Sequence, residues 1–280
     1  MKRAEADAFR PVSTAAVKGL IAKGLAEDCF TDFLHDPDGF VDDPAGDVIK
    51  DGTKSKVVRK RIAAGNGATR SIVVKRFRYA APVRRLGFFF AIPPALKALR
   101  SALRLKRHGF ATAEPLAAFQ CRSWKCRGTS YYIAEEIADG LSLRAFWLSG
   151  TSGNERLRIV PAIIRRLAEL FFQLHRAGLY HRDLKGSNIL MRDWQTARPR
   201  FFLVDLEVSA GRRPLSWRKR FKNLLQVRLA WSARERAYFY FCYAKLCRAS
   251  RRDAKALARR LLALHAAARH HRRTAGSRLR

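Results

Sequence analysis

The chain has 280 residues, 48% of them hydrophobic, which is enough to bury a sizeable core in a two-lobed domain. Its most apolar stretches, residues 86–96 and 237–244, are too short to cross a bilayer, and its five cysteines lack zinc-ligand spacing. We therefore expect no transmembrane segment, no cysteine-based metal site, and idle thiols in a reducing compartment. Residues 1–51 hold 11 acidic and 6 basic residues, whereas residues 52–280 hold 12 acidic and 51 basic ones, a cationic body that attracts polyanions.

Residues 1–46 are predicted to form an acidic N-terminal extension. Charges are spread through residues 1–26 without an apolar core, so we expect no secretory signal. Residues 12–26 are predicted to form a short helix with Ser13 or Thr14 as its N-cap. The aspartates between residues 36 and 43 lack the twelve-position loop and terminal Glu of a calcium site, which favours a solvated turn.

The next part of the chain is predicted to form strands. Residues 47–62 have the pattern of a strand, a tight loop and a second strand. Gly65–Gly67 is predicted to turn the chain into a β-branched strand over residues 70–77, which carries Lys75. Beyond it we expect a basic helix over residues 94–108. Two further strands are predicted, over residues 116–121 and 130–137.

The most informative motif is the octet HRDLKGSN at residues 181–188, which follows an amphipathic helix predicted over residues 159–178. Phosphoryl transfer uses an Asp and an Asn at this spacing: Asp183 orients a hydroxyl nucleophile and takes its proton, and Asn188 reaches a metal ion. Lys185 can place its ammonium group on the moving phosphoryl group. The alternative is a charged surface turn, which eight ordered positions disfavour.

A short apolar strand over residues 201–207 contains a second candidate metal ligand, Asp205. With Lys75 and the octet it completes an ordered set of strand Lys, helix, HRD loop and strand Asp. This order resembles the protein-kinase-like superfamily and, within it, the bacterial lipopolysaccharide kinase group, the Kdo and heptose kinases. The segments that carry the resemblance are VVKRF at 73–77, ATAEPLA at 111–117, HRDLKGSNIL at 181–190, LVDLE at 203–207 and RFKNL at 220–224.

The resemblance implies an α+β, two-lobed protein-kinase-like fold with a small antiparallel β-rich N-lobe over residues 47–138 and a helical C-lobe over residues 139–250. Residues 251–280 are expected to form a basic C-terminal helix or tail. The implied cofactors are ATP and Mg²⁺, the metal held by Asn188 and Asp205. The residues expected to bind the nucleotide are Lys75, Gly52, Thr53 and Ser55 at the phosphates, and the backbone of Glu135 and Ile137 at adenine.

Three departures from ordinary protein kinases are apparent. The chain after Asp205 is short and lacks an APE motif, which favours a small or lipid-linked acceptor over a protein. Only one of the three usual loop glycines is present. No Asp or Glu occurs between Arg76 and Ala113, so we expect Lys75 to be paired with Glu207, with Asp205 or with the phosphates alone.

Two segments suit an anionic membrane surface. Residues 84–94 place two arginines beside three phenylalanines and two prolines, a pattern of bilayer interfaces, although the aromatic rings could instead pack between the lobes. Residues 251–273 form a basic helix, which we expect to cap the C-lobe rather than to anchor lipid. His265, His270 and His271 on it are predicted to be solvated.

The sequence therefore predicts an ATP- and Mg²⁺-dependent kinase of a sugar hydroxyl, on Kdo or heptose of the lipopolysaccharide inner core. We expect a cytoplasmic protein, peripheral on the inner membrane. Its partners would be ATP, the core sugar or another hydroxyl acceptor and the anionic membrane surface, without specific nucleic acid. The alternatives are a protein Ser/Thr or small-metabolite kinase, and a pseudokinase or polyanion-binding protein.

Overall fold

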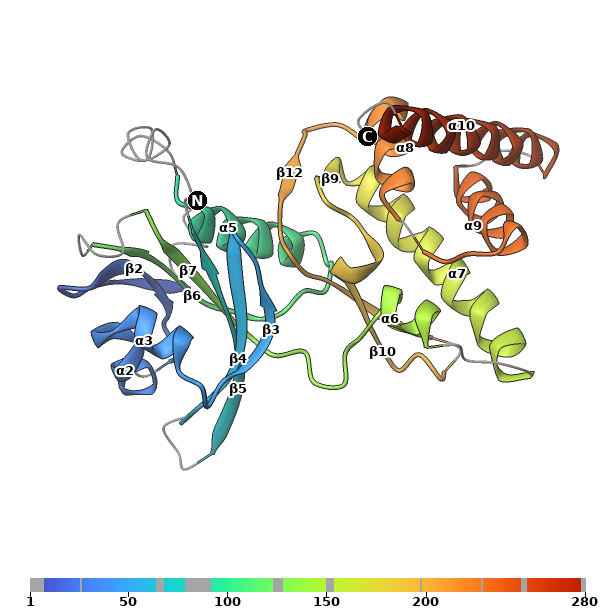
Figure 1. Ribbon diagram of the computed structural model, residues 1–280. Helices are drawn as coiled ribbons and strands as arrows, with labels where there is room; N and C mark the ends of the chain where they lie inside the picture. Colours follow the sequence, from blue (N-terminus) through green and yellow to red (C-terminus); the bar gives the residue numbers. More distant parts are fainter. Residues whose placement is uncertain are drawn as a thin grey trace. The chain divides into compact units, whose positions relative to one another are not determined.

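The computed structural model describes residues 8–25, 27–63, 68–78, 92–122, 128–149, 154–196, 198–227, 229–247 and 251–277. The chain divides into two units, Met1–Ala138 and Asp139–Arg280. Figure 1 colours the first from blue to green and the second from green to red. The first is built on a large sheet and the second mainly of helices, which confirms the predicted α+β class.

The first unit contains a seven-stranded antiparallel sheet in the order β1-β2-β6-β7-β5-β4-β3. Its strands are β1 Phe9–Ser13, β2 Val17–Ala22, β3 Asp47–Asp51, β4 Ser55–Ala63, β5 Thr69–Phe77, β6 Pro115–Cys121 and β7 Ser130–Glu135. The predicted hairpin over residues 47–62, the strand that carries Lys75 and the two later strands are thereby confirmed. Within the described residues, the sheet ends at β1 on one edge and at β3 on the other.

The helix predicted over residues 12–26 is wrong, because this segment forms the β1–β2 hairpin. The Thr14 hydroxyl accepts hydrogen bonds from the backbone N–H groups of Ala16 and Val17, at 3.2 and 3.1 Å. These bonds imitate a helix cap but tighten a turn instead. Val17 and Ile21 are both fully buried, and two residues that far apart lie on one face of a strand as well as on one face of a helix.

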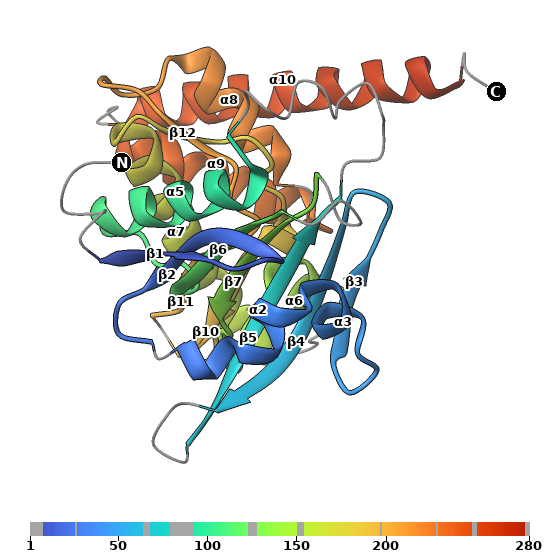
Figure 2. The same cartoon turned by 90° about the vertical axis from the view of Figure 1, so that its left-hand side faces the viewer.

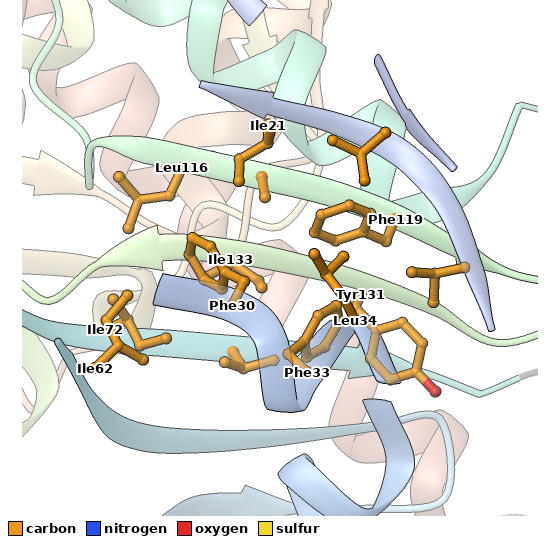
Figure 3. Close-up of a cluster of buried hydrophobic side chains, with 14 of the residues drawn as sticks. Ile21, Phe30, Phe33, Leu34, Ile62, Ile72, Leu116, Phe119, Tyr131 and Ile133 are labelled. Atoms are coloured by element: carbon orange, nitrogen blue, oxygen red, sulfur yellow. The ribbon is translucent and has the colours of Figure 1, made fainter. Parts of the chain in front are cut away.

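One face of the sheet is covered by η1 Glu27–Phe30, α2 Thr31–His35 and α3 Pro37–Asp42. Phe33 packs against Phe119 and Tyr131 from β6 and β7, with ring centroids 5.3 Å apart in both pairs. Figure 3 shows these rings in one cluster with Ile72 of β5. Since side chains alternate along a strand, burial of Ile72 and Val74 on this face places Lys75 on the other.

Among the described residues of the first unit the remaining helix is α5 Pro94–Arg107, which confirms the predicted basic helix. It packs against β6 and β7, and its backbone N–H at Ala95 donates to the Ser130 hydroxyl at 3.3 Å. Figure 2 shows α5 and α3 beside the sheet. Nearly every residue of β6 and β7 is buried, because helices cover these central strands on both faces.

The aspartates of residues 36–43 form a helix with ion pairs, so the predicted solvated turn is wrong. Asp36 caps α3 by accepting from the Gly39 N–H at 3.0 Å. Arg76, only 5% exposed, donates to both carboxylate oxygens of Asp42 at 2.6 and 2.8 Å. Further ion pairs join Arg76 to Asp38, Lys56 to Asp42 and Lys60 to Asp43. The bonds from Arg76 lower the pKa of Asp42 to about 2.

The second unit contains mainly helices and two small sheets, in the orders β11-β10-β8 and β12-β9. Its strands are β8 Leu141–Ser142, β9 Leu179–His181, β10 Ile189–Arg192, β11 Arg200–Leu203 and β12 Val208–Ala210. Its helices are α6 Leu143–Leu148, α7 Asn154–Arg176, η3 Gly186–Asn188, α8 Trp217–Gln226, α9 Ala233–Leu246 and α10 Arg251–Ser277. The helices predicted before the octet and at the C-terminus are confirmed.

The C-terminal helix α10 packs against α9. The Nδ1 atom of His265 lies 2.9 Å from the Tyr240 hydroxyl, so the prediction that His265 is solvated is wrong. The side chains of His270 and His271 lie outside the described residues. None of the helices in the described part of the chain has the length and hydropathy that a transmembrane segment needs.

The predicted turn at Gly65–Gly67 lies outside the described residues, as do residues 84–91 of the basic-aromatic segment predicted over residues 84–94. The cysteine prediction needs one correction. Cys29, Cys242 and Cys247 are free thiols, but Cys121 at the end of β6 is disulfide-bonded. The prediction of idle thiols is therefore wrong for Cys121.

Candidate active site

The HRD loop connects β9 to β10 and brings three of the predicted site residues together. The ammonium of Lys185 lies 2.6 Å from Oδ2 of Asp183. The Asn188 side-chain N–H donates to the Asp183 carbonyl oxygen at 2.8 Å and to its Oδ2 at 3.2 Å. Because the Asn188 nitrogen faces Asp183, its carbonyl oxygen points elsewhere and can serve a metal ion.

Strand pairing brings the fourth predicted residue, Asp205, next to Asn188. Ile189 of β10 lies opposite Leu203 of β11, and the Val204 N–H donates to the backbone carbonyl of Asn188 at 3.0 Å. Asp205 has a φ of +56°, a left-handed conformation that few residues other than Gly, Asn and Asp adopt. Asp205 therefore lies at a sharp bend directly after β11.

The donor set of this site suits a small, hard cation. The described residues contain no cluster of three or more His, Cys, Asp and Glu side chains able to hold a metal. One carboxylate and one amide oxygen, from Asp205 and Asn188, are typical of Mg²⁺, which usually binds few protein ligands together with substrate phosphates. The residues present thus fit a nucleotide-bound magnesium ion better than a resident metal.

Helix α8 holds the backbone of the HRD loop through two side chains. The Asn223 side-chain N–H donates to the His181 carbonyl at 2.6 Å. Gln226 accepts from the Leu184 N–H at 3.1 Å and donates to the Arg182 carbonyl at 2.5 Å. Asn223 also donates to Gln226 at 3.0 Å, so the two amides form one unit on one helix face.

Neither α8 amide was recognised as a site residue from the sequence. The segment RFKNL drew attention only through its resemblance to the lipopolysaccharide kinases. The interval of three between Asn223 and Gln226 was the available signal, since residues three apart on a helix share a face. Their partners lie more than 40 positions earlier in the chain, and this pairing cannot be read from local sequence.

His181 stabilises the loop in its neutral form. Burial lowers its pKa to about 4, although Asp205 favours the charged form. The Asp183 N–H donates to Nδ1 of His181 at 3.3 Å, which requires that nitrogen to be unprotonated. With this geometry His181 shapes the loop rather than taking part in the reaction.

A second buried histidine, His175 near the end of α7, makes the stability of the protein depend on pH. Burial lowers its pKa to about 3, and its Nδ1 lies 2.7 Å from the Tyr243 hydroxyl. In the unfolded chain His175 binds a proton near pH 6.5. The contribution of neutral, buried His175 to stability is therefore full above pH 6.5 and is lost as the pH falls toward 3.

The variant His175→Asn, which can retain the bond to Tyr243, tests this pH dependence. Between pH 7 and pH 5 the wild-type protein should lose about 2 kcal/mol more unfolding free energy than the variant. Urea unfolding followed by tryptophan fluorescence measures this difference, since four of the five tryptophans lie in the second unit. Equal losses in the two proteins would show that His175 is not buried in its neutral form.

The remaining predicted site residues lie in the first unit. The loop between β3 and β4 is tight, with the Gly52 N–H donating to the Ser55 carbonyl at 3.1 Å, and it includes Thr53. Lys75 lies on the face of β5 opposite the α2–α3 core, with its ammonium 4.8 Å from the centre of the Phe77 ring. Its proposed partners Glu207 and Asp205 belong to the second unit, so this pairing stays a prediction.

The end of β7 carries the residues expected at adenine. The Glu135 N–H donates to the Glu114 carbonyl at 2.8 Å, which leaves the Glu135 carbonyl and the Ile137 backbone as the candidate contacts. Glu136 forms an ion pair with Arg59 at 2.6 Å.

An antiparallel sheet unit followed by a helical unit with an HRD-type loop defines the class: a phosphotransferase with the protein-kinase-like fold. The lipopolysaccharide kinase (Kdo/WaaP) family model matches residues 83–259, more than half of the chain, and the chain belongs to this family. The predicted family, and the prediction of a kinase that acts on an alcohol group with ATP as phosphate donor, are confirmed.

Solved structures similar to the chain include the following two. WaaP in complex with acyl carrier protein has 22% sequence identity and a TM-score of 0.60, covering 86% of this chain and 95% of that one. The PknI kinase domain of Mycobacterium tuberculosis has 13% identity and a TM-score of 0.38, covering 69% of this chain and 72% of that one. The first likeness confirms the protein-kinase-like fold. No curated protein matches the sequence significantly.

Proposed function

We propose that this kinase transfers the γ-phosphoryl group of ATP to a hydroxyl of Kdo or heptose in the lipopolysaccharide inner core, at the cytoplasmic face of the inner membrane. The observation that carries the proposal is the Asp183 carboxylate, bonded through Oδ2 by both Lys185 and Asn188. Family membership supports the acceptor class.

In this proposal Asp183 is the catalytic carboxylate. Both of the hydrogen bonds to its side chain fall on Oδ2, so Oδ1 is the oxygen assigned to the acceptor hydroxyl. It orients that hydroxyl and accepts its proton as the new bond to phosphorus forms. Lys185 already lies at this carboxylate and supplies a positive charge to the transferred group.

Asn188 and Asp205 are the proposed ligands of Mg²⁺. Held by these two side chains, a magnesium ion would supply positive charge to the phosphate groups during transfer. The bond from the Val204 N–H to the backbone carbonyl of Asn188 keeps these two ligands adjacent before the nucleotide binds.

Residues 47–138 and 139–250 are proposed to act as the N-lobe and C-lobe. Lys75 is assigned to the α- and β-phosphates, and the backbone of Glu135 and Ile137 to adenine. The β3–β4 loop, with Gly52, Thr53 and Ser55, is assigned to the phosphates. Its amides and hydroxyls are the groups that bind anions in such turns.

Acyl carrier protein is a second candidate partner, because one similar structure is WaaP in complex with that protein. Copurification of acyl carrier protein with the wild-type chain would support this role.

Transfer of labelled phosphate from ATP to purified dephosphorylated lipopolysaccharide tests the function. The protein should label this acceptor in the presence of Mg²⁺ and lose the activity with a chelator. It should prefer lipopolysaccharide to protein substrates and to small hydroxyl metabolites. Preferential labelling of either of those would favour the alternative kinases, and no ATP turnover at all would favour a pseudokinase.

A further inference from the structure

Cationic side chains and an exposed tryptophan lie on α8 and in the turn before it. No acidic residue occurs from Val208 to Arg234. The exposed side chains of this surface, here called the α8 patch, are Arg212, Arg213, Trp217, Arg218, Lys219 and Lys222. None of the five cations forms an ion pair among the described residues, so their charge is directed to solvent or to a partner.

The patch is held firmly against the unit. The Leu215 N–H donates to the His175 carbonyl at 2.8 Å, and the Gly211 N–H donates to the Gly178 carbonyl at 3.0 Å. Arg220 joins the turn before α8 to the helix, because its Nε donates to the Leu215 carbonyl at 2.8 Å. The patch is therefore presented as a preformed surface.

The α8 patch differs from a purely cationic surface because it includes the exposed ring of Trp217. It is 50% exposed, and its ring lies 5.1 Å from the guanidinium of Arg220. An exposed indole among lysines and arginines is typical of the region between lipid headgroups and acyl chains, where an apolar ring and its N–H are both accommodated. Long cationic stems reach the phosphates of the same layer.

The same helix holds the HRD loop through Asn223 and Gln226. Helix α8 has ten residues, about 15 Å in length, and it packs beside β9 (Figure 1). One short helix thus carries four of the six patch residues and also contacts the catalytic loop. A surface that binds the patch is brought close to Asp183.

We infer that the α8 patch docks on an anionic lipid surface and thereby presents the HRD loop to an acceptor that is anchored in it. The inference rests on the proposed lipid-linked acceptor and adds the surface of the protein that faces the lipid. Charge complementarity commits it to anionic headgroups, with Trp217 entering the interface.

Binding to vesicles tests the inference without requiring catalysis. The full chain is sedimented with vesicles of phosphatidylcholine alone or with equal parts of phosphatidylglycerol. The wild-type protein should bind the anionic vesicles only, and the triple variant Arg218→Glu, Lys219→Glu, Lys222→Glu should bind roughly 100-fold more weakly. In brominated vesicles, quenching of fluorescence should be larger for the wild type than for Trp217→Phe.

The matched control is Lys255→Glu, Arg259→Glu, Arg260→Glu on α10, which makes the same change in charge at exposed residues of the same unit. This control and Asp183→Asn should bind anionic vesicles as strongly as the wild type does. Vesicle binding therefore tests the inference independently of kinase activity. Equal losses in the two triple variants would mean non-specific attraction and would overturn the inference. Binding of a soluble acidic protein through the α8 patch, without binding to vesicles, would overturn it as well.

Discussion

Replacing Asp183 by Asn is expected to lower kcat by roughly 10³-fold and to leave the KM for ATP nearly unchanged. The amide keeps the shape of the side chain but cannot accept the proton of the acceptor hydroxyl. Folding should be unaffected, because the Asp183 and Lys185 side chains are 45% and 42% exposed, and such pairs contribute little to stability. Steady-state kinetics and a thermal melt measure both effects.

Asp193→Asn is the matched control for this substitution. Asp193 is exposed in the same unit and, like Asp205, has a positive φ, which asparagine tolerates. Its kcat should equal that of the wild type. If Asp183→Asn also retained wild-type turnover, Asp183 would not be the catalytic carboxylate.

Removing the side-chain amide of Gln226 should lower kcat by roughly 10- to 100-fold with little change in the KM for ATP. In Gln226→Ala the Leu184 N–H and the Arg182 carbonyl lose their partner, and the backbone on both sides of Asp183 is released. Gln226→Glu should recover part of the loss, since a carboxylate still accepts from Leu184 but cannot donate to Arg182. A positioning role therefore predicts the order wild type, Glu, Ala in kcat.

Gln173→Ala makes the same truncation at an exposed position of α7 and should leave kcat unchanged. The order of the kcat values separates positioning from a general loss of structure, which would reduce the active fraction without ordering the variants. Equal kcat values for Gln226→Ala and the wild type would exclude Gln226 from positioning the loop. Asn223→Ala should lose stability as well, because Asn223 is fully buried.

The parts of the fold that were predicted correctly have local causes. The HRD octet is held by bonds among its own residues, such as those from Lys185 and Asn188 to Asp183, so its spacing carries its geometry. Helix α7 and the β3–β4 hairpin both have strong periodic patterns of apolar residues. Each of these elements forms for reasons contained in a short stretch of sequence.

The incorrect predictions involve partners that are distant in sequence or a local signal with two meanings. Thr14 accepts backbone N–H bonds as a helix cap does, but its hairpin forms because β2 pairs with β6, almost 100 residues away. The sequence near α3 predicts a solvated turn, but Arg76 of β5 binds the aspartates there, and this contact joins residues far apart in the chain. Likewise, the contact of His265 with Tyr240 requires α10 to pack on α9.

The same distinction between near and distant partners applies to the candidate site. Asp183, Lys185 and Asn188 come together because they lie in one short loop, and Asp205 joins them because it follows β11, which pairs with the strand after that loop. Gln226 was missed because its role depends on a helix that follows the loop by some forty positions. The nucleotide-binding residues of the first unit stay predictions, as does the partner of Lys75.

The most direct test of the central claim is mass spectrometry of the lipopolysaccharide core from cells with and without this gene. Without the gene, the core should lack one phosphate. The phosphate should return when the wild-type chain is supplied, but not when Asp183→Asn is supplied. An identical core in all strains, or restoration by Asp183→Asn, would contradict the proposal that this kinase phosphorylates a core sugar.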